Sequence, residues 1–288
     1  MKTKNEVVSS LSNPIFIVGC QRSGTTWLQR LLTSHPEILG GAESDFFVGF
    51  QGAFNDLSVA DGERNVKMLL EYWEKDHLIS KIYDLWTETF FEFILKHEGR
   101  IFCEKSPSHA LHIDSINMLL PQAKVIHIIR DSRSTTASML AASKGWGKSW
   151  APRTAKSAAI SWYLHVSKAR KSGMNLGCKR YMEVHYEDLK HATPKQLERI
   201  FDFVGVEYDS ALVQNIIREQ DFDKQKLIGG TPLDKEGAKR QEPVGFFRKG
   251  QVDSWKKDLS LVQKLIVWRY TRKLMKEVGY SWNGRVYE

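Results

Sequence analysis

Short apolar runs alternate with segments of helical periodicity along most of the chain. Residues 15–18 are apolar at every position, which is typical of a strand buried on both faces of a parallel sheet. Gly19 ends this run, and residues 25–34 then carry three leucines at helical spacing. The pattern predicts a first unit of strand, glycine-bounded turn and helix over residues 14–36.

The same alternation continues toward the C-terminus. Further strands are predicted at residues 37–41, 101–104, 124–129 and 180–185. Helices are predicted at residues 66–97, 109–120, 154–171, 194–204, 209–219 and 261–278. Residues 227–250 hold five glycines and two prolines with little periodicity, and they predict a long loop. Because strands alternate with helices, we expect an α/β fold: one domain over residues 1–288, with a central parallel sheet and helices on both faces.

Composition narrows the class of protein. Hydrophobic residues make up 42% and charged residues 26%, as in soluble globular proteins. No apolar run is long enough for a membrane span, and the first residues do not read as a signal peptide, so a cytoplasmic location is expected. Cys20, Cys103 and Cys178 lie far apart without a C-x-x-C pair, which argues against a disulfide framework and against a zinc site.

The charge is positive and unevenly distributed. The net charge of +8 favours an anionic partner, which leaves nucleic acid, an anionic surface and a polyanionic small ligand open. Residues 51–100 hold ten acidic and six basic residues, whereas residues 222–257 hold nine basic and five acidic ones. The basic segment near the C-terminus therefore requires an explanation.

The sharpest motif is a glycine-bounded loop between the first strand and the first helix. Residues 19–26 read GCQRSGTT, which has the G-x-x-x-x-G spacing of a phosphate-binding loop. Backbone amides at the start of the helix would hold a phosphate without a metal ion. Thr25 stands where nucleoside triphosphatases place a lysine, and the nearest cation is Arg22. A ligand with one 5′-phosphate fits this loop better than ATP does.

Four segments together resemble one enzyme family. The run 16–28 is similar to the 5′-phosphosulfate loop of sulfotransferases that use 3′-phosphoadenosine 5′-phosphosulfate (PAPS). Residues 130–138 resemble the 3′-phosphate motif of that family, and residues 247–250 resemble the C-terminal R-K-G motif of its cytosolic members. Residues 186–189 match a Y-E-D element between them. The resemblance spans residues 14–257 and implies the P-loop NTPase-like sulfotransferase fold, PAPS as donor, adenosine 3′,5′-bisphosphate (PAP) as product, and no metal.

The resemblance and the chemistry together assign the donor site. An adenosine bisphosphate needs two anion sites, and positions 130 and 138 lie on nearly the same face of a helix, so an arginine and a serine there can reach one phosphate. Residues 222–257 are expected to form a basic lid, in which Arg248 and Lys249 would close on the donor. The expected donor-binding residues are Arg22, Ser23, Gly24, Thr25, Thr26, Trp27, Arg130, Ser138, Tyr186, Arg248, Lys249 and Gly250.

The expected catalytic residues combine features of two branches of the family. Arg22 and Lys105 are predicted to stabilise the charge of the transferred and leaving groups, and the E-K-S-P run around Lys105 resembles that of carbohydrate sulfotransferases. Cytosolic members place their catalytic histidine where this chain has Pro107. In the heparan and tyrosyl sulfotransferases a glutamate acts as the general base. Glu43 occupies a similar place in this sequence and is the predicted general base. The remaining alternatives for the base are Asp45, His109 and His112.

The acceptor is less defined by the sequence. Aromatic residues of the helical insert at 51–100 either belong to the core or wall an acceptor site, and Trp146 and Trp150 suit a sugar ring or an apolar chain. We expect a hydroxyl on a small molecule, a glycan or a carrier-bound intermediate, with a homodimer left open. Two alternatives are a P-loop kinase, with Asp131 holding magnesium, and a basic nucleic-acid-binding protein.

Overall fold

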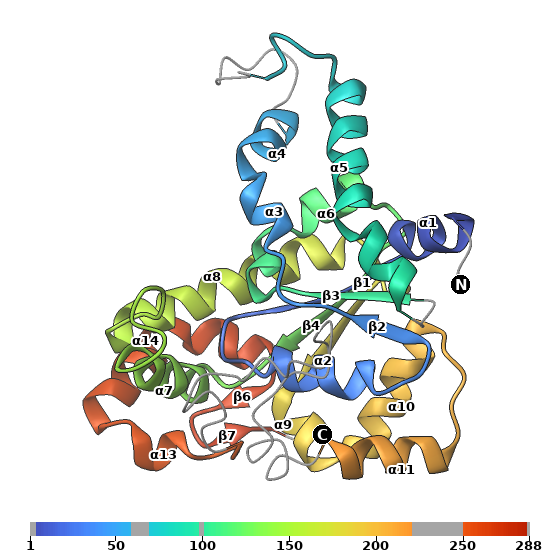
Figure 1. The fold of residues 1–288 in the computed structure, drawn as a ribbon. Coiled ribbons are helices and arrows are strands. Elements are labelled where there is room, and N and C mark those ends of the chain that lie inside the picture. Colours follow the sequence, from blue (N-terminus) through green and yellow to red (C-terminus); the bar gives the residue numbers. More distant parts are fainter. Residues whose placement is uncertain (1–3, 59–68, 98–100, 221–249, 287–288) are drawn as a thin grey trace.

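The fold is built on a sheet of five parallel strands. The computed structural model describes residues 4–58, 69–97, 101–220 and 250–286. The strand order is β2-β3-β1-β4-β5, and every pairing is parallel (Figure 1). The strands are β1 (Ile15–Gly19), β2 (Ile38–Gly40), β3 (Ile101–Lys105), β4 (Lys124–Ile129) and β5 (Tyr181–His185). The predicted parallel sheet is therefore confirmed.

Helices cover both faces of the sheet, as predicted (Figure 1). One layer includes α1 (Lys4–Ser12), α5 (Lys75–Lys96), α6 (Ile113–Leu119) and α8 (Ala155–Met174). The other includes α2 (Thr25–Thr33), α10 (Thr193–Val204) and α11 (Ser210–Glu219). The remaining described elements are α3 (Phe46–Gly49), α4 (Gln51–Ser58), η1 (Pro107–Leu111), α7 (Ser132–Ser143), α9 (Tyr186–His191), α13 (Trp255–Asp258), α14 (Leu261–Glu277), β6 (Tyr280–Ser281) and β7 (Gly284–Arg285).

Strand β1 explains why its sequence is apolar at every position. Phe16 and Val18 pack in the cluster that contains α1 and α5, whereas Ile15 and Ile17 pack in the cluster that contains α2 and α10. All four side chains are buried. Each contributes roughly 1.5–3 kcal/mol by leaving water. The strand is thus fixed between two layers, and its carboxyl end delivers the glycine-bounded loop to one edge of the sheet.

Two predicted helices differ from the structure, and a third has a more exposed apolar side chain than expected. The long helix of the insert begins at Lys75 rather than at residue 66, and residues 59–68 lie outside the described part of the chain. The predicted helix 109–120 is divided into the 3₁₀ turn η1 and α6, because His112 has a non-helical backbone between them. Helix α14 is present, but Leu265 is exposed. Its first turns therefore leave apolar residues in water.

The described aromatic residues of the insert belong mainly to the core. Trp86 is fully buried, and its ring lies 5.7 Å from Phe16 and 4.5 Å from Phe90. Phe90 in turn contacts Phe102 of β3 at 5.0 Å. Leu85, which was expected on the same stripe, is 39% exposed. A role of segment 51–100 in acceptor binding stays a prediction. In the described ranges, no helix combines the length and the apolar character that a membrane crossing requires.

Candidate functional site

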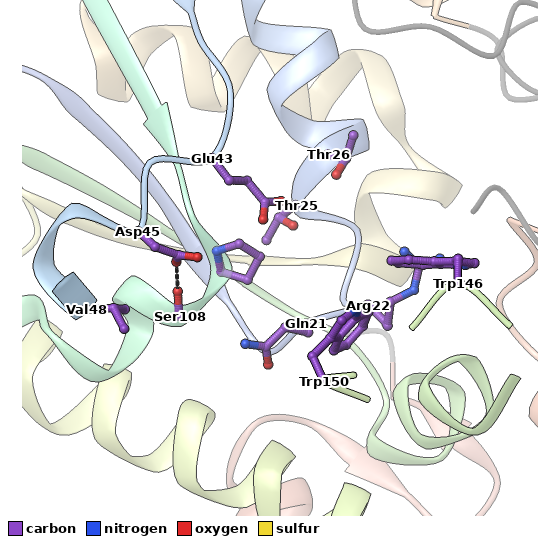
Figure 2. Close-up of a pocket in the computed structure, with 11 residues that line it drawn as sticks. Gln21, Arg22, Thr25, Thr26, Glu43, Asp45, Val48, Ser108, Trp146 and Trp150 are labelled. Atoms are coloured by element: carbon purple, nitrogen blue, oxygen red, sulfur yellow. Dashed lines mark hydrogen bonds between the residues drawn. The ribbon is translucent and has the colours of Figure 1, made fainter. Parts of the chain in front are cut away.

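A pocket of about 390 Å³ opens at the carboxyl ends of β1 and β3 (Figure 2). This is the edge of an open parallel sheet at which ligands generally bind. Its lining joins four segments: the loop after β1, the loop after β2, the turn after β3 and the loop after α7. The described lining residues are Gln21, Arg22, Thr25, Thr26, Glu43, Asp45, Val48, Pro107, Ser108, Trp146 and Trp150.

The loop after β1 has the conformation of an anion-binding turn. Arg22 and Gly24 both have positive φ angles, of 72° and 104°. A Cβ atom at Gly24 would lie 2.5 Å from Cδ2 of Tyr186, so the close approach requires glycine there. Helix α2 begins at the next residue, Thr25, and its first amides face the turn with the positive end of the helix dipole.

Two buried donors beside this turn lack a described partner. Ser23 is fully buried, and its hydroxyl has no hydrogen-bond partner among the described residues. The same holds for Nε of Arg130, whose side chain is 8% exposed. Buried polar groups without partners cost free energy, whereas a bound anion would satisfy both. The residues present therefore fit a phosphorylated ligand.

Hydrogen bonds of Arg22 connect the two predicted anion sites. An Nη1 hydrogen of Arg130 is donated to the carbonyl oxygen of Arg22 at 3.4 Å. Nε of Arg22 donates to the hydroxyl of Ser138 at 3.1 Å. Arg130 precedes α7 and Ser138 lies within it, so the two residues converge on Arg22 from different elements. Arg22, predicted on the 5′-phosphate side, therefore contacts both residues predicted for the 3′-phosphate.

The Tyr186 ring packs against the guanidinium group of Arg130. The guanidinium carbon of Arg130 lies 4.1 Å from the centre of the Tyr186 ring, and the Tyr186 hydroxyl donates to the Gly250 carbonyl at 3.1 Å. Trp27 meets the edge of the same ring at 5.5 Å and is 9% exposed. Tyr186 thus connects the predicted donor site to the segment after residue 249. Arg248 and Lys249 lie outside the described residues, as does most of the predicted basic lid.

Lys105 forms an ion pair with Glu43, which lines the pocket. The Lys105 ammonium donates to the Glu43 carboxylate and also lies 3.4 Å from the Thr26 hydroxyl. Lys105 is 5% exposed, whereas Glu43 faces the pocket with its side chain 45% exposed. A buried cation therefore stands between the loop that begins α2 and the predicted base. This juxtaposition can hold negative charge on one side and accept a proton on the other.

Glu104 fixes the loop that carries Glu43. Its Oε1 accepts hydrogen bonds from the hydroxyls of Ser44 (2.8 Å) and Ser106 (2.6 Å) and from the Ser44 amide (3.2 Å). Its Oε2 is 2.9 Å from Nδ1 of His109. Burial alone would raise the pKa of Glu104, but His109 and the two serines outweigh it and lower the pKa. The sequence motif contains Glu104, yet its role becomes visible only in the structure.

The two histidine alternatives for the base are not supported. His109 is fully buried, and its Nε2 accepts the Phe47 amide at 3.3 Å, so Nδ1 carries the proton that Glu104 accepts. Both ring nitrogens are thereby engaged. Burial lowers the pKa of His112 to about 4, which makes its imidazole a weak base at neutral pH. Asp45 faces the pocket and accepts a hydrogen bond from Ser108. Glu43 is the carboxylate that contacts Lys105.

Asp131 does not present a free carboxylate to a metal ion. It caps α7 by accepting the Arg133 amide at 2.8 Å, and it also accepts Nε and Nη2 of Arg133 at 3.0 and 2.6 Å. The pair is buried. The kinase alternative, in which Asp131 holds magnesium, is therefore wrong for this carboxylate. Across the described ranges, no group of three or more His, Cys, Asp or Glu side chains is arranged to hold a metal ion.

Glu187 lies behind the Arg130 segment and is fully buried. It accepts the Asp131 amide at 3.1 Å and the Tyr280 hydroxyl at 2.5 Å. Burial, together with the nearby Asp131 charge, raises the pKa of Glu187 to about 7. The motif at residues 186–189 matched this residue without assigning it a role. Its contacts now tie the turn after β4 to the C-terminal hairpin β6–β7.

The raised pKa of Glu187 makes stability depend on pH. The folded protein favours the protonated carboxyl, so this contribution is complete below pH 4.5 and is lost as pH rises to about 7, by up to about 3 kcal/mol. Glu187→Gln keeps a neutral hydrogen-bonding group and should abolish that loss. We expect the free energies of unfolding of the two proteins, measured in urea from pH 4.5 to 8, to diverge with rising pH. Parallel curves would contradict the assignment.

Comparisons with known proteins identify the family to which the chain belongs. A model of the sulfotransferase family matches residues 14–210. A Caenorhabditis briggsae protein assigned as a protein-tyrosine sulfotransferase is 24% identical over 215 residues, which cover 73% of this chain and 71% of the relative. Protein-tyrosine sulfotransferase 2 of Gallus gallus is 24% identical over 204 residues, which cover 70% of this chain and only 53% of the relative.

Solved structures share the fold. Mouse sulfotransferase SULT7A1 complexed with PAP aligns with a TM-score of 0.57 and 19% identity, covering 95% of this chain and 90% of the mouse chain. The sulfotransferase domain of the Synechococcus PCC 7002 olefin synthase aligns with a TM-score of 0.56 and 22% identity, covering 91% of this chain and 95% of the domain. Because the family model covers more than half of the residues, the chain belongs to the sulfotransferase family, the PAPS-dependent enzymes that its motifs resemble.

Proposed function

We propose that the pocket is the place of sulfuryl transfer and that Glu43 is the general base. The protein is a PAPS-dependent O-sulfotransferase. PAPS supplies a sulfuryl group on a phosphate leaving group. The bond from sulfur to the acceptor oxygen forms while the bond from sulfur to the phosphate oxygen breaks, and PAP leaves with the electron pair. The acceptor proton passes to the Glu43 carboxylate.

The observation that carries this proposal is the contact of the buried Lys105 side chain with both Glu43 and Thr26. Transfer of this kind depends on positioning and on charge stabilisation that is already in place. Lys105 and the amides at the start of α2 supply positive charge where the leaving group would gain negative charge. Glu43, on the pocket side of Lys105, is positioned to receive a proton. Stabilisation of the leaving group and acceptance of the proton thus take place on opposite sides of Lys105.

The proposed donor pose spans the turn after β1 and the Arg130 segment. The 5′-phosphate would lie on the α2 amides with Thr25 and Thr26, and the 3′-phosphate would lie between Arg130 and Ser138. The unpartnered donors of Ser23 and Arg130 support this pose. The two indole rings that line the pocket, Trp146 and Trp150, support an acceptor that presents a ring, either a small molecule or the exposed end of a larger one. The names of the curated relatives support a phenolic hydroxyl.

Binding of PAP tests the donor site directly. Arg130→Ala should weaken PAP binding by about 1.5–3 kcal/mol, roughly 10–150-fold in Kd, because it removes a charge-assisted contact. Isothermal calorimetry with PAP measures the change, and magnesium-ATP serves as the competing ligand. Arg218→Ala on α11 is the matched control, since it removes the same charge far from the pocket. Tight magnesium-ATP binding together with unchanged PAP affinity in Arg130→Ala would contradict the proposal.

A further inference from the structure

The acceptor side of the pocket has an uneven charge pattern. The charged side chains among its described lining residues are Arg22, Glu43 and Asp45. Arg22 is engaged with Ser138, and Glu43 is paired with Lys105. Asp45 accepts a hydrogen bond from the neutral Ser108 hydroxyl, and none of the ion pairs among the described residues includes it. The nearby His112 imidazole interacts with the Asp45 charge but is neutral at neutral pH, because burial lowers the pKa of His112 to about 4. The Asp45 charge is therefore available to whatever enters the pocket.

The backbone holds Asp45 in an unusual conformation. Its φ angle is 46°, in the left-handed region that costs energy for residues other than glycine. Its amide donates to the Ser106 hydroxyl at 3.0 Å, and its carbonyl accepts the amides of Val48 (2.9 Å) and Gly49 (3.0 Å). The same network that fixes Glu43 thus also fixes Asp45, two residues later. A strained residue with fixed backbone partners holds its carboxylate in a defined place at the pocket.

The wall opposite these carboxylates is aromatic. Trp146 and Trp150 have ring centres 5.3 Å apart and planes inclined by 51° (Figure 2). The Arg22 guanidinium lies 5.1 Å from the Trp146 ring, at the boundary with the donor site. Trp150 is 42% exposed, so its ring has contact area to offer. Indole faces bind flat rings and attract cations through the negative charge above their planes.

We propose that Asp45 is a specificity-determining residue for the acceptor. The pocket would take a ring-bearing alcohol or phenol whose substituent carries a hydrogen-bond donor, either ammonium or hydroxyl, and it would discriminate against acceptors with a negatively charged substituent. The two indoles bind the ring, Glu43 accepts the proton of the reacting hydroxyl, and Asp45 accepts a hydrogen bond from the substituent. A carboxylate placed beside Asp45 would meet a like charge with no described counterion. This inference rests on the proposed function, because it takes Glu43 as the reaction centre.

Three phenols that share the ring and differ in the terminal group test the inference. Tyramine ends in ammonium, tyrosol in hydroxyl and 3-(4-hydroxyphenyl)propionate in carboxylate. With PAPS as donor, we expect kcat/KM to fall in that order, by about tenfold or more from tyramine to the carboxylate. Asp45→Asn should reduce the ratio between the charged substrates to about threefold or less. Asp84→Asn on α5, which removes the same charge from an exposed pair outside the pocket, should leave the ratio as in the unmodified protein.

Binding to the PAP-loaded protein provides the second measurement. The three phenols should bind in the same order, and Trp150→Ala should weaken all three to a similar extent. If the carboxylate is the best substrate, or if Asp84→Asn changes the ratio as much as Asp45→Asn does, the inference is wrong. If PAP binds but none of the phenols binds or reacts, the acceptor class is wrong while the donor assignment stands. If PAP itself does not bind, the proposed function fails first.

Discussion

Glu43→Gln should lower the turnover number by about 10²–10⁴-fold, which is the usual contribution of a positioned general base. Glutamine preserves the size of the side chain and can still accept a hydrogen bond from Lys105, but it cannot take the acceptor proton. The affinity for PAP should stay nearly the same, because Glu43 lies on the acceptor side of Lys105. Single-turnover kinetics with PAPS and a phenolic acceptor, together with PAP calorimetry, separates the two quantities.

The control for Glu43→Gln is Glu92→Gln, which makes the same change in an exposed ion pair on α5. Its turnover should equal that of the unmodified protein. Unchanged turnover in Glu43→Gln would transfer the role of base to another group, and Asp45 is the next carboxylate in the pocket. A large loss of PAP affinity in Glu43→Gln would instead indicate that the carboxylate acts mainly by holding Lys105.

Glu104→Ala should lower the free energy of unfolding by about 3–5 kcal/mol, the usual cost of removing one partner from a buried charged network. Ser44, Ser106 and His109 would each lose the carboxylate that accepts their hydrogen bonds. Because these contacts hold the loop that carries Glu43, turnover should fall by more than PAP affinity. Urea unfolding measures the stability, and the ratio of kcat to PAP affinity measures the effect on positioning.

A milder variant keeps this prediction testable if Glu104→Ala does not fold. Ser106→Ala removes the hydroxyl that accepts the Asp45 amide, but it leaves Glu104 bound to Ser44 and His109. It should cost about 1–3 kcal/mol and lower turnover in the same direction. Glu92→Ala, on the exposed face of α5, provides the baseline. A destabilised Ser106→Ala protein with unchanged turnover would show that the network acts on stability alone.

Much of the fold was predictable because local patterns and tertiary packing agree. The run at 15–18 is apolar on both faces because two helical layers cover β1. The helix at 109–120 was predicted incorrectly as one segment, since periodicity does not reveal a break at His112. The hairpin β6–β7 was missed because each of its strands has only two residues. Elements this short produce no periodic signal.

The candidate site was predictable where a motif carries its own chemistry. Arg22, Glu43 and Lys105 were identified from sequence. The structure brings Arg22, Thr26 and Glu43 to one pocket, and Lys105 contacts the last two of them. The network of Glu104 was not predictable, because Ser44, which joins it to the loop that carries Glu43, lies 60 residues away along the chain. Which segments lie side by side is a property of the tertiary fold, and the periodicity within one segment does not specify it.

The end of β3 has a consequence for the tolerance of this enzyme to changes in chain length. Phe16 pairs with Glu104 and Ile17 with Lys105, so the two charged side chains leave the sheet on opposite faces. Deleting or inserting a single residue within this strand would exchange them, burying the ammonium among the aromatic rings and turning the anchoring carboxylate toward the sulfuryl donor. Homologous chains should therefore vary in length within their loops, whereas the spacing from strand start to Lys105 should be invariant.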